Sequence, residues 1–275
     1  ASANAQPAGT ALVRHAPAFR GTVDGSVQQM TAEATTLNGG AAVTEDLLVP
    51  GMPAVQLNGN PAYGGTLEST GSTTPSNYRV TLDGNATLRH VVRRTDAVAL
   101  PAVSAPPQPG GTRTVTITAP GQTAGDFATL RHLTFNANVG QFAIPPGTYG
   151  DFTANGGSGF TLGIAGATQP SVYNFQHLTL NGQTEIQVVG PIILTVANGF
   201  VANGAIGSSA HPAWLALNIY SGPFRLNGGC SAYGFVTASN STVTIEGNSQ
   251  LIGGLACDRL TVNGAGLLRL APAVN

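Results

Sequence analysis

Leu178-Thr179-Leu180-Asn181-Gly182 is a short strand of alternating apolar and polar residues that ends in an Asn-Gly corner. Close variants of this phrase recur at 35–39, 55–59, 80–84, 224–228, 243–247 and 260–264. A strand and a corner that return at spacings of about 17 to 26 residues are what each turn of a coil of short strands requires. The repeat therefore predicts an all-β chain that folds as a single-chain β-solenoid, also called a β-helix.

A second repeat sets the length of one coil. The phrase Ala86-Thr87-Leu88-Arg89-His90 recurs unchanged at 128–132, and the phrase at 132–136 returns in similar form at 177–181 and 259–263. These intervals are multiples of about 21 residues, which suits three short strands and their corners. With strands about 4.8 Å apart, we expect about twelve coils and a rod of about 55 Å.

The alternation within each strand indicates which side chains form the core. In Thr242-Val243-Thr244-Ile245 the aliphatic residues share one face and the threonines the other, which is the period of a half-buried strand. Asn-Gly and Asp-Gly favour the left-handed backbone region that a sharp corner needs. We expect the aliphatic residues to point inward and the threonines outward.

Two irregular stretches interrupt the repeat. Residues 1–20 are rich in Ala and lack the phrase, so we expect an extended N-terminal arm. Residues 101–112 contain Pro-Ala-Val-Ser-Ala-Pro-Pro-Gln-Pro-Gly-Gly, which predicts an extended loop or linker. The predicted organisation is an arm at 1–20, N-terminal coils at 21–100, the linker at 101–112 and C-terminal coils at 113–275.

Composition narrows the classes of partner. The chain has 37 Gly, 18 Pro, 8% charged residues and a net charge of −1, and its 11 basic residues are all arginine. This leaves no basic stripe of the kind that neutralises nucleic-acid phosphates. No apolar run is long enough to span a bilayer. The small residues Ala1-Ser2-Ala3-Asn4-Ala5 resemble what remains after removal of an export signal, which favours secretion.

The two cysteines, Cys230 and Cys257, are candidates for a disulfide. Aligning their glycine-rich surroundings places them near each other on successive coils. In that alignment they are offset by two positions, and diagonal neighbours lie roughly 7 to 8 Å apart, slightly beyond ordinary disulfide reach. A bridge and two buried free thiols are both left open.

Residues that could carry chemistry are few. The 12 acidic residues are scattered, whereas polysaccharide lyases and hydrolases built on β-solenoids need clustered carboxylates. His90, His132 and His177 occupy equivalent places in the repeat, but two coils, or about 9 to 10 Å, separate successive members, too far to share a metal ion. We therefore expect no catalytic residues, no metal site and no cofactor. Outward threonines that could bind a sugar or another regular surface remain an alternative.

Part of the chain resembles a known family. Residues 144–150 read Ile-Pro-Pro-Gly-Thr-Tyr-Gly, and the Asn-Gly coils follow from 173 to 253. This pattern resembles a family of uncharacterised bacterial exported β-solenoid domains, which combine a Pro-Gly-Thr-Tyr strand with repeated Leu-Asn-Gly coils and occur in envelope or pilus-associated proteins. The architecture is also similar to that of bactofilins, which are polymer-forming β-helical scaffold proteins. The resemblance implies a structural role and no catalytic residues.

These observations predict an extracellular structural protein of the bacterial cell surface, whose subunits join end to end into a filament or surface layer. The open ends of a solenoid expose unpaired backbone groups that copies of the chain could satisfy. The residues expected at the subunit contacts are Ala11, Leu12, Val13, Phe19, Leu267, Leu268 and Leu270. The alternatives are a monomeric adhesin or carbohydrate-binding module, with cell-surface polysaccharide as its partner, and a polysaccharide-cleaving enzyme.

Overall fold

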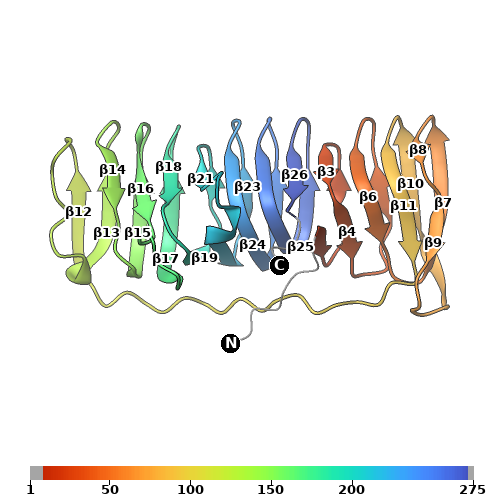
Figure 1. The fold of residues 1–275 in the computed structure, drawn as a ribbon, viewed down its shortest axis with the longest axis horizontal. Coiled ribbons are helices and arrows are strands. Elements are labelled where there is room, and N and C mark those ends of the chain that lie inside the picture. Colours follow the sequence, from red (N-terminus) through yellow and green to blue (C-terminus); the bar gives the residue numbers. More distant parts are fainter. Residues whose placement is uncertain (1–8, 272–275) are drawn as a thin grey trace.

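The computed structural model describes residues 9–271 and confirms the all-β class. Its 26 strands form one hydrogen-bonded sheet that is wound into an elongated rod (Figure 1). The pairings are parallel, so each strand lies beside the equivalent strand of a neighbouring turn. The rod is therefore a stack of turns of chain whose side chains repeat in register.

The N-terminal segment, residues 9–93, contains strands β1 to β11. Their bounds are β1 (Thr10–Val13), β2 (Ala18–Phe19), β3 (Thr22–Asp24), β4 (Ser26–Gln29), β5 (Thr35–Leu37), β6 (Ala42–Leu48), β7 (Met52–Gly59), β8 (Ala62–Tyr63), β9 (Thr66–Glu68), β10 (Pro75–Gly84) and β11 (Thr87–Arg93).

The C-terminal segment, residues 113–271, contains the remaining strands and two short 3-10 helices. Their bounds are β12 (Arg113–Ile117), η1 (Phe127–Thr129), β13 (Leu130–Phe135), β14 (Gly140–Ala143), β15 (Gly147–Ala154), β16 (Ser158–Leu162), β17 (Ser171–Leu180), β18 (Glu185–Val188), β19 (Ile192–Asn198), β20 (Val201–Ala202), β21 (Ile206–Gly207), η2 (Pro212–Trp214), β22 (Leu215–Ser221), β23 (Phe224–Leu226), β24 (Ser231–Ile245), β25 (Gln250–Val262) and β26 (Leu267–Leu270).

Three ladders of strands run along the rod, and we call them faces 1, 2 and 3. Face 1 contains β1 and β4, face 2 contains β2 and β5, and face 3 contains β3 and the first half of β6. Long strands bend across more than one face, and β25 contributes to all three ladders. The Asn-Gly corners end the strands of face 2.

The order of turns along the rod differs from their order in the sequence (Figure 1). The first described strand, β1, lies near the middle of the rod, and β7, β8 and β9 form the last turn at one end. The next turn, β10 and β11, is inserted behind them against β5 and β6. Residues 94–112 then contain no helix or strand and cross to the opposite end, where β12 begins. From there the chain winds back toward the middle.

The last turn meets the first turn at the middle of the rod. β25 pairs with β1 and β2, and β26 pairs with β3. We call this junction the seam. The predicted N-terminal arm is therefore wrong for residues 10–20, which form β1 and β2 inside the stack, while residues 1–8 lie outside the described residues. The N-terminal and C-terminal coils lie in one continuous stack, because the first and last turns pair at the seam.

The inward side chains of all three faces form one continuous apolar core. On face 2 the positions before the corners are filled by residues such as Leu37, Leu180 and Leu226, which are buried. The glycines of the corners adopt the left-handed region, with φ of 63° at Gly39 and 66° at Gly182. The sequence prediction of inward aliphatic residues and left-handed corners is thus confirmed.

Candidate functional site

The seam contains the residues predicted as subunit contacts, and the structure places them inside the molecule. Their side chains belong to the first and last turns and are buried, except Leu267, which is half-buried; the set is Ala11, Leu12, Val13, Phe19, Leu267, Leu268 and Leu270. Strand β1 is paired on both sides, by β25 and β4. These residues therefore join two parts of one chain, and the prediction that they face a second subunit is wrong.

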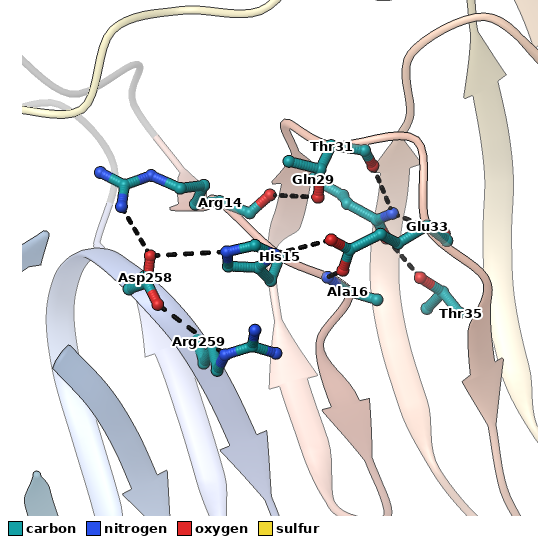
Figure 2. A network of polar contacts seen from close by, with 9 residues as sticks. All are labelled: Arg14, His15, Ala16, Gln29, Thr31, Glu33, Thr35, Asp258 and Arg259. Atoms are coloured by element: carbon teal, nitrogen blue, oxygen red, sulfur yellow. Dashed lines mark hydrogen bonds and ion pairs between the residues drawn. The ribbon is translucent and has the colours of Figure 1, made fainter. Parts of the chain in front are cut away.

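A polar network lies across the seam (Figure 2). Arg14 Nη1 donates to Asp258 Oδ1 at 2.7 Å, which links the first turn to the last. The ring of His15 lies between two carboxylates, with Nδ1 2.7 Å from Glu33 Oε1 and Nε2 3.8 Å from Asp258 Oδ1. Arg259 Nε is 3.8 Å from the other Asp258 oxygen. Three successive turns are therefore connected by one chain of polar side chains.

The contacts of the seam lower the pKa of the Glu33 carboxyl group. A hydrogen bond from the backbone N–H of Ala16, at 3.0 Å, and then one from the His15 side chain hold the pKa of Glu33 below its ordinary value. Desolvation opposes this shift to a smaller extent. The ionised carboxylate is thus the form that the folded seam favours. The sequence carried no signal for this network, because Arg14 and Asp258 are far apart along the chain.

The segment 94–112 lies along the rod and contacts both halves of the stack; we call it the strap. Gln28 Nε2 donates to the Asp96 carbonyl at 2.9 Å, and Gln176 Nε2 donates to the Pro107 carbonyl at 2.8 Å. Between them, the Ser239 hydroxyl donates to the Pro101 carbonyl. The strap therefore runs next to β4, β24 and β17 in turn, on one side of the rod.

Two of the repeated histidines share one aspartate. His132 Nδ1 lies 3.2 Å from Asp151 Oδ2, and His177 Nδ1 lies 2.6 Å from Asp151 Oδ1. Asp151 belongs to the turn between them, so His132 and His177 are two turns apart, as the repeat predicts. The predicted equivalence is wrong for His90, which lies 2.9 Å from Asp46 where face 3 passes into face 1, whereas His132 and His177 directly precede face 2. Within residues 9–271 no group of three or more His, Cys, Asp or Glu side chains is placed to hold a metal ion.

Acidic side chains elsewhere pair mostly with single basic partners. Arg93 binds Glu68, with Nε to Oε1 at 2.8 Å, and Arg269 Nε lies 3.0 Å from Asp24. Arg89 pairs in the same way with Glu45. The carboxylates of Glu68, Asp24 and Glu45 thus act as structural ion-pair partners. A surface hollow is lined by Ala32, Gly51, Ser72 and residues 74–78, none of which is acidic.

Of the two states left open for the cysteines, the structure has the free thiols and not the disulfide. Cys230 and Cys257 are both free and buried, and Cys230 Sγ donates to the Gly204 carbonyl. Cys257 lies on face 1, level with Ala238 of the previous turn, whereas Cys230 precedes β24 at a corner beside Ser249. The alignment of glycines on which the bridge depended does not correspond to the register of the strands. Burial raises the pKa of the Cys230 thiol to about 12.

The outward threonines fall in one row on face 2. Register pairings connect them in two groups along the rod: Thr116, Thr134, Thr153 and Thr179, and then Thr244, Thr261, Thr36 and Thr81. Val201 and Arg225 occupy the row between the groups, and Ala18 lies between Thr261 and Thr36. Exposure is uneven along the row, because Thr179 is exposed whereas Thr244 is 9% exposed.

The two ends of the rod differ in how their cores are covered. At the β7 end, Leu57 is 51% exposed, although its register partner Leu82 in the next turn and Leu37 behind that are fully buried. β7, β8 and β9 are each paired on one side within the described residues. We call this surface the open end, because no strand of residues 9–271 pairs with the outer side of the last turn.

The opposite end is covered by residues 118–129. The inward residues Ile117 and Leu130 are each 1% exposed there, in contrast with Leu57 at the open end. Arg113 Nη2 donates to the carbonyls of Ala124 and Asp126, both at 2.7 Å, and so ties the loop to β12. Phe127 completes the cover with an edge-to-face contact to another ring, Tyr149. We call this surface the covered end.

No helix within residues 9–271 combines the length and the apolar character needed to cross a membrane. Comparisons of the chain with protein-family models, with curated proteins and with solved structures found no match.

Proposed function

We propose that the chain is a β-solenoid whose function is structural, and that it associates end to end with copies of itself through the open end. The three parallel ladders support the solenoid class, and face 2 contains about twelve levels of strand. The observation that carries the functional proposal is the uncovered last turn. Its inward position at Leu57 is half exposed, while the equivalent residues behind it are buried.

The backbone of that turn supports the same proposal. Soluble sheets protect exposed edges with charges, bulges, short strands or covering loops, because a bare edge pairs with other chains. β7 is eight residues long and reads Met-Pro-Ala-Val-Gln-Leu-Asn-Gly, without a charged residue. β7 is neither short nor charged, so its free edge can pair with a strand of another chain.

The test is the mass of the purified chain as a function of concentration. We expect association between about 1 and 200 µM, the range of a weak and reversible contact, measured by sedimentation equilibrium. Leu57→Arg should weaken it, since the arginine would place charge in the contact. Val172→Arg is the matched control, because Val172 is 47% exposed but lies away from both ends. A monomer over the whole range would contradict the proposal.

A second candidate function is binding of a cell-surface polysaccharide along face 2. The row of outward threonines favours it, because hydroxyl groups repeated at about 4.8 Å provide a regular set of donors and acceptors. Replacing Thr134, Thr153 and Thr179 together by Val keeps the β-branched shape and removes the hydroxyls. Loss of binding in a glycan array, with wild-type binding present, is the expected result. Both candidate functions suit the extracellular location at a bacterial surface that the sequence and the family resemblance favour, and we propose that location as well.

A further inference from the structure

The two unlike ends restrict how copies of this rod can join. A filament needs a head-to-tail contact, in which the open end of one copy meets the covered end of the next. At the covered end Ile117, which stands in the place of Leu57, is buried beneath residues 118–129, although Val115 and Phe142 are half-buried and β12 and β14 are each paired on one side only within the described residues. The half-exposed Leu57 therefore finds an equally exposed leucine at its own register position on the open end of a second copy, whereas the covered end presents the buried Ile117 there.

We propose that the open end is the interface of a closed head-to-head dimer, in which the last turns of two copies face each other across a two-fold axis. This inference rests on the proposed end-to-end association and names its partner surface and its symmetry. It replaces the filament expected from the sequence by an assembly of two rods, because an isologous contact uses up the interface of both partners.

The strands of the last turn fit this symmetry. A two-fold axis perpendicular to the rod and passing through the middle of face 2 reverses the direction of β7, so β7 pairs with β7 of the second copy in antiparallel orientation. The same rotation exchanges faces 1 and 3 and brings β8 opposite β9. Both are short, at two and three residues. The eight residues of β7 therefore form the main part of the contact.

The charges of the open end also permit it to face itself. Any unpaired charge near a two-fold axis meets its own copy, and like charges directly opposite are destabilising. Glu68 is the single charged residue of β7, β8 and β9, and it is bound by Arg93 of the turn behind. Gln56 and Asn58 of the edge are uncharged, and their amides bond to each other and to Arg79 and Asp83 of the turn behind, whose charges are of opposite sign. The surface is thus close to neutral and self-complementary.

Apolar contact supplies the second half of the interaction. Leu57 and the partly buried Val55 and Tyr63 occupy the inward positions of the last turn. A second copy stacked on this turn covers these side chains, in the same way that the turn of β10 and β11 covers the turn of β5 and β6. The apolar core of one copy thereby continues into the apolar core of the second copy across the two-fold axis.

Cross-linking with matched cysteine variants tests the symmetry directly. Gln56→Cys places a thiol on the open end, and Gln141→Cys places one on β14 at the opposite end; both positions are exposed, whereas the native thiols are buried. A bis-maleimide with a span of about 10 Å is added to each variant alone and to an equal mixture. We expect covalent dimers from Gln56→Cys alone, none from Gln141→Cys alone, and no mixed product.

Sedimentation equilibrium of the unlabelled chain completes the test. The expected result is a mass that stops at twice 27.7 kDa as the concentration rises, and Leu57→Arg should weaken dimerisation at least tenfold. Larger assemblies, together with cross-links that form only in the mixture, would overturn the head-to-head dimer while leaving end-to-end association in place. A monomer at 200 µM would overturn both.

Discussion

Leu57 and Leu82 stand at the same register position in neighbouring strands, yet one is 51% exposed and the other fully buried. The difference arises from the place of each turn in the stack and not from the local sequence, since both precede an Asn-Gly or Asp-Gly corner. Residues of this repeat therefore differ in their contribution to stability according to what covers them.

The leucine pair gives a direct measurement of that difference. We expect Leu82→Ala to lower the free energy of unfolding by about 2 to 5 kcal/mol, because it leaves a cavity in the core. Leu57→Ala removes the same atoms from a half-exposed site and should cost less than about 1 kcal/mol. Urea unfolding of the monomeric chain checks both variants. Equal losses would mean that the last turn is covered in solution.

A glycine at a close approach offers a second prediction. A Cβ at Gly199 would lie 1.9 Å from the backbone oxygen of Pro223 in the next turn, whereas a Cβ at Gly40 meets nothing within 4 Å. Gly199→Ala should therefore separate the two turns and cost more than about 2 kcal/mol. Gly40→Ala is the control and should change stability by less than about 1 kcal/mol. Urea midpoints of the two variants, compared with wild type, decide the matter.

The lowered pKa of Glu33 predicts a pH dependence of the seam. A carboxyl group whose pKa is depressed on folding stabilises the protein above its unfolded pKa, here 4.5, and this stabilisation is lost as pH falls through the folded pKa. We expect Glu33→Gln to be less stable than wild type at pH 7 and the two to converge below pH 4.5. His15 and Asp258 are the neighbouring titratable groups.

The control for this measurement is Glu185→Gln on β18. Glu185 is exposed and its side chain has no ion pair within residues 9–271. Its unfolding curves should therefore follow those of wild type from pH 7 to pH 4. A gap between wild type and Glu33→Gln that stays constant with pH would show that Glu33 acts through shape and not through charge.

At the scale of the strands, the sequence predicted which residues form strands better than it predicted which strands pair with each other. The Asn-Gly phrase placed the strands of face 2, whereas the identical pentapeptides at 86–90 and 128–132 do not occupy equivalent places: Leu88 pairs on face 3, and His132 directly precedes face 2. All turns share one pattern of inward and outward residues, however, so any turn can stack on any other. The position of β10 behind β7, and the pairing of β25 with β1, depend on which edges remain free and carry no local signal.

The strap also shows what local pattern misses. Its Pro and Gly residues predicted the absence of regular structure, but nothing in them indicated that residues 94–112 would lie along the rod. Their contacts are made by single side chains of distant strands, such as Gln28 and Gln176. The same holds for the polar network of the seam, whose members come from opposite ends of the sequence.

Cutting the strap tests whether the seam holds the two segments together. We expect a chain cleaved at a protease site placed between the exposed residues Ser104 and Ala105 to elute as one species, because three strand pairs and a buried apolar contact remain. Leu268→Glu, which buries a charge in the seam, should let the cleaved fragments separate. Gel filtration before and after cleavage gives the answer, and separation of the wild-type fragments would contradict it.

The whole molecule has a length that its ladder defines. About twelve levels of strand at about 4.8 Å give a rod of about 55 Å, and a head-to-head dimer of about 110 Å. Small-angle X-ray scattering should therefore show a maximum dimension that doubles with concentration while the cross-section stays constant. A cross-section that grows would indicate side-by-side contact of rods instead.

Because the last turn pairs with the first at the seam, both ends of the described chain leave the rod near the middle of its length. Gly9 lies beside Ser26, and Ala271 lies beside Gly253. A pulling force applied at these two points loads the seam first, and the tips of the rod carry none of it. Once the seam parts, the strap still connects the far tips, and its roughly 19 residues reach about 60 Å when extended. The two segments would then separate as two stacks that the strap still connects, and the seam could form again when the force is removed.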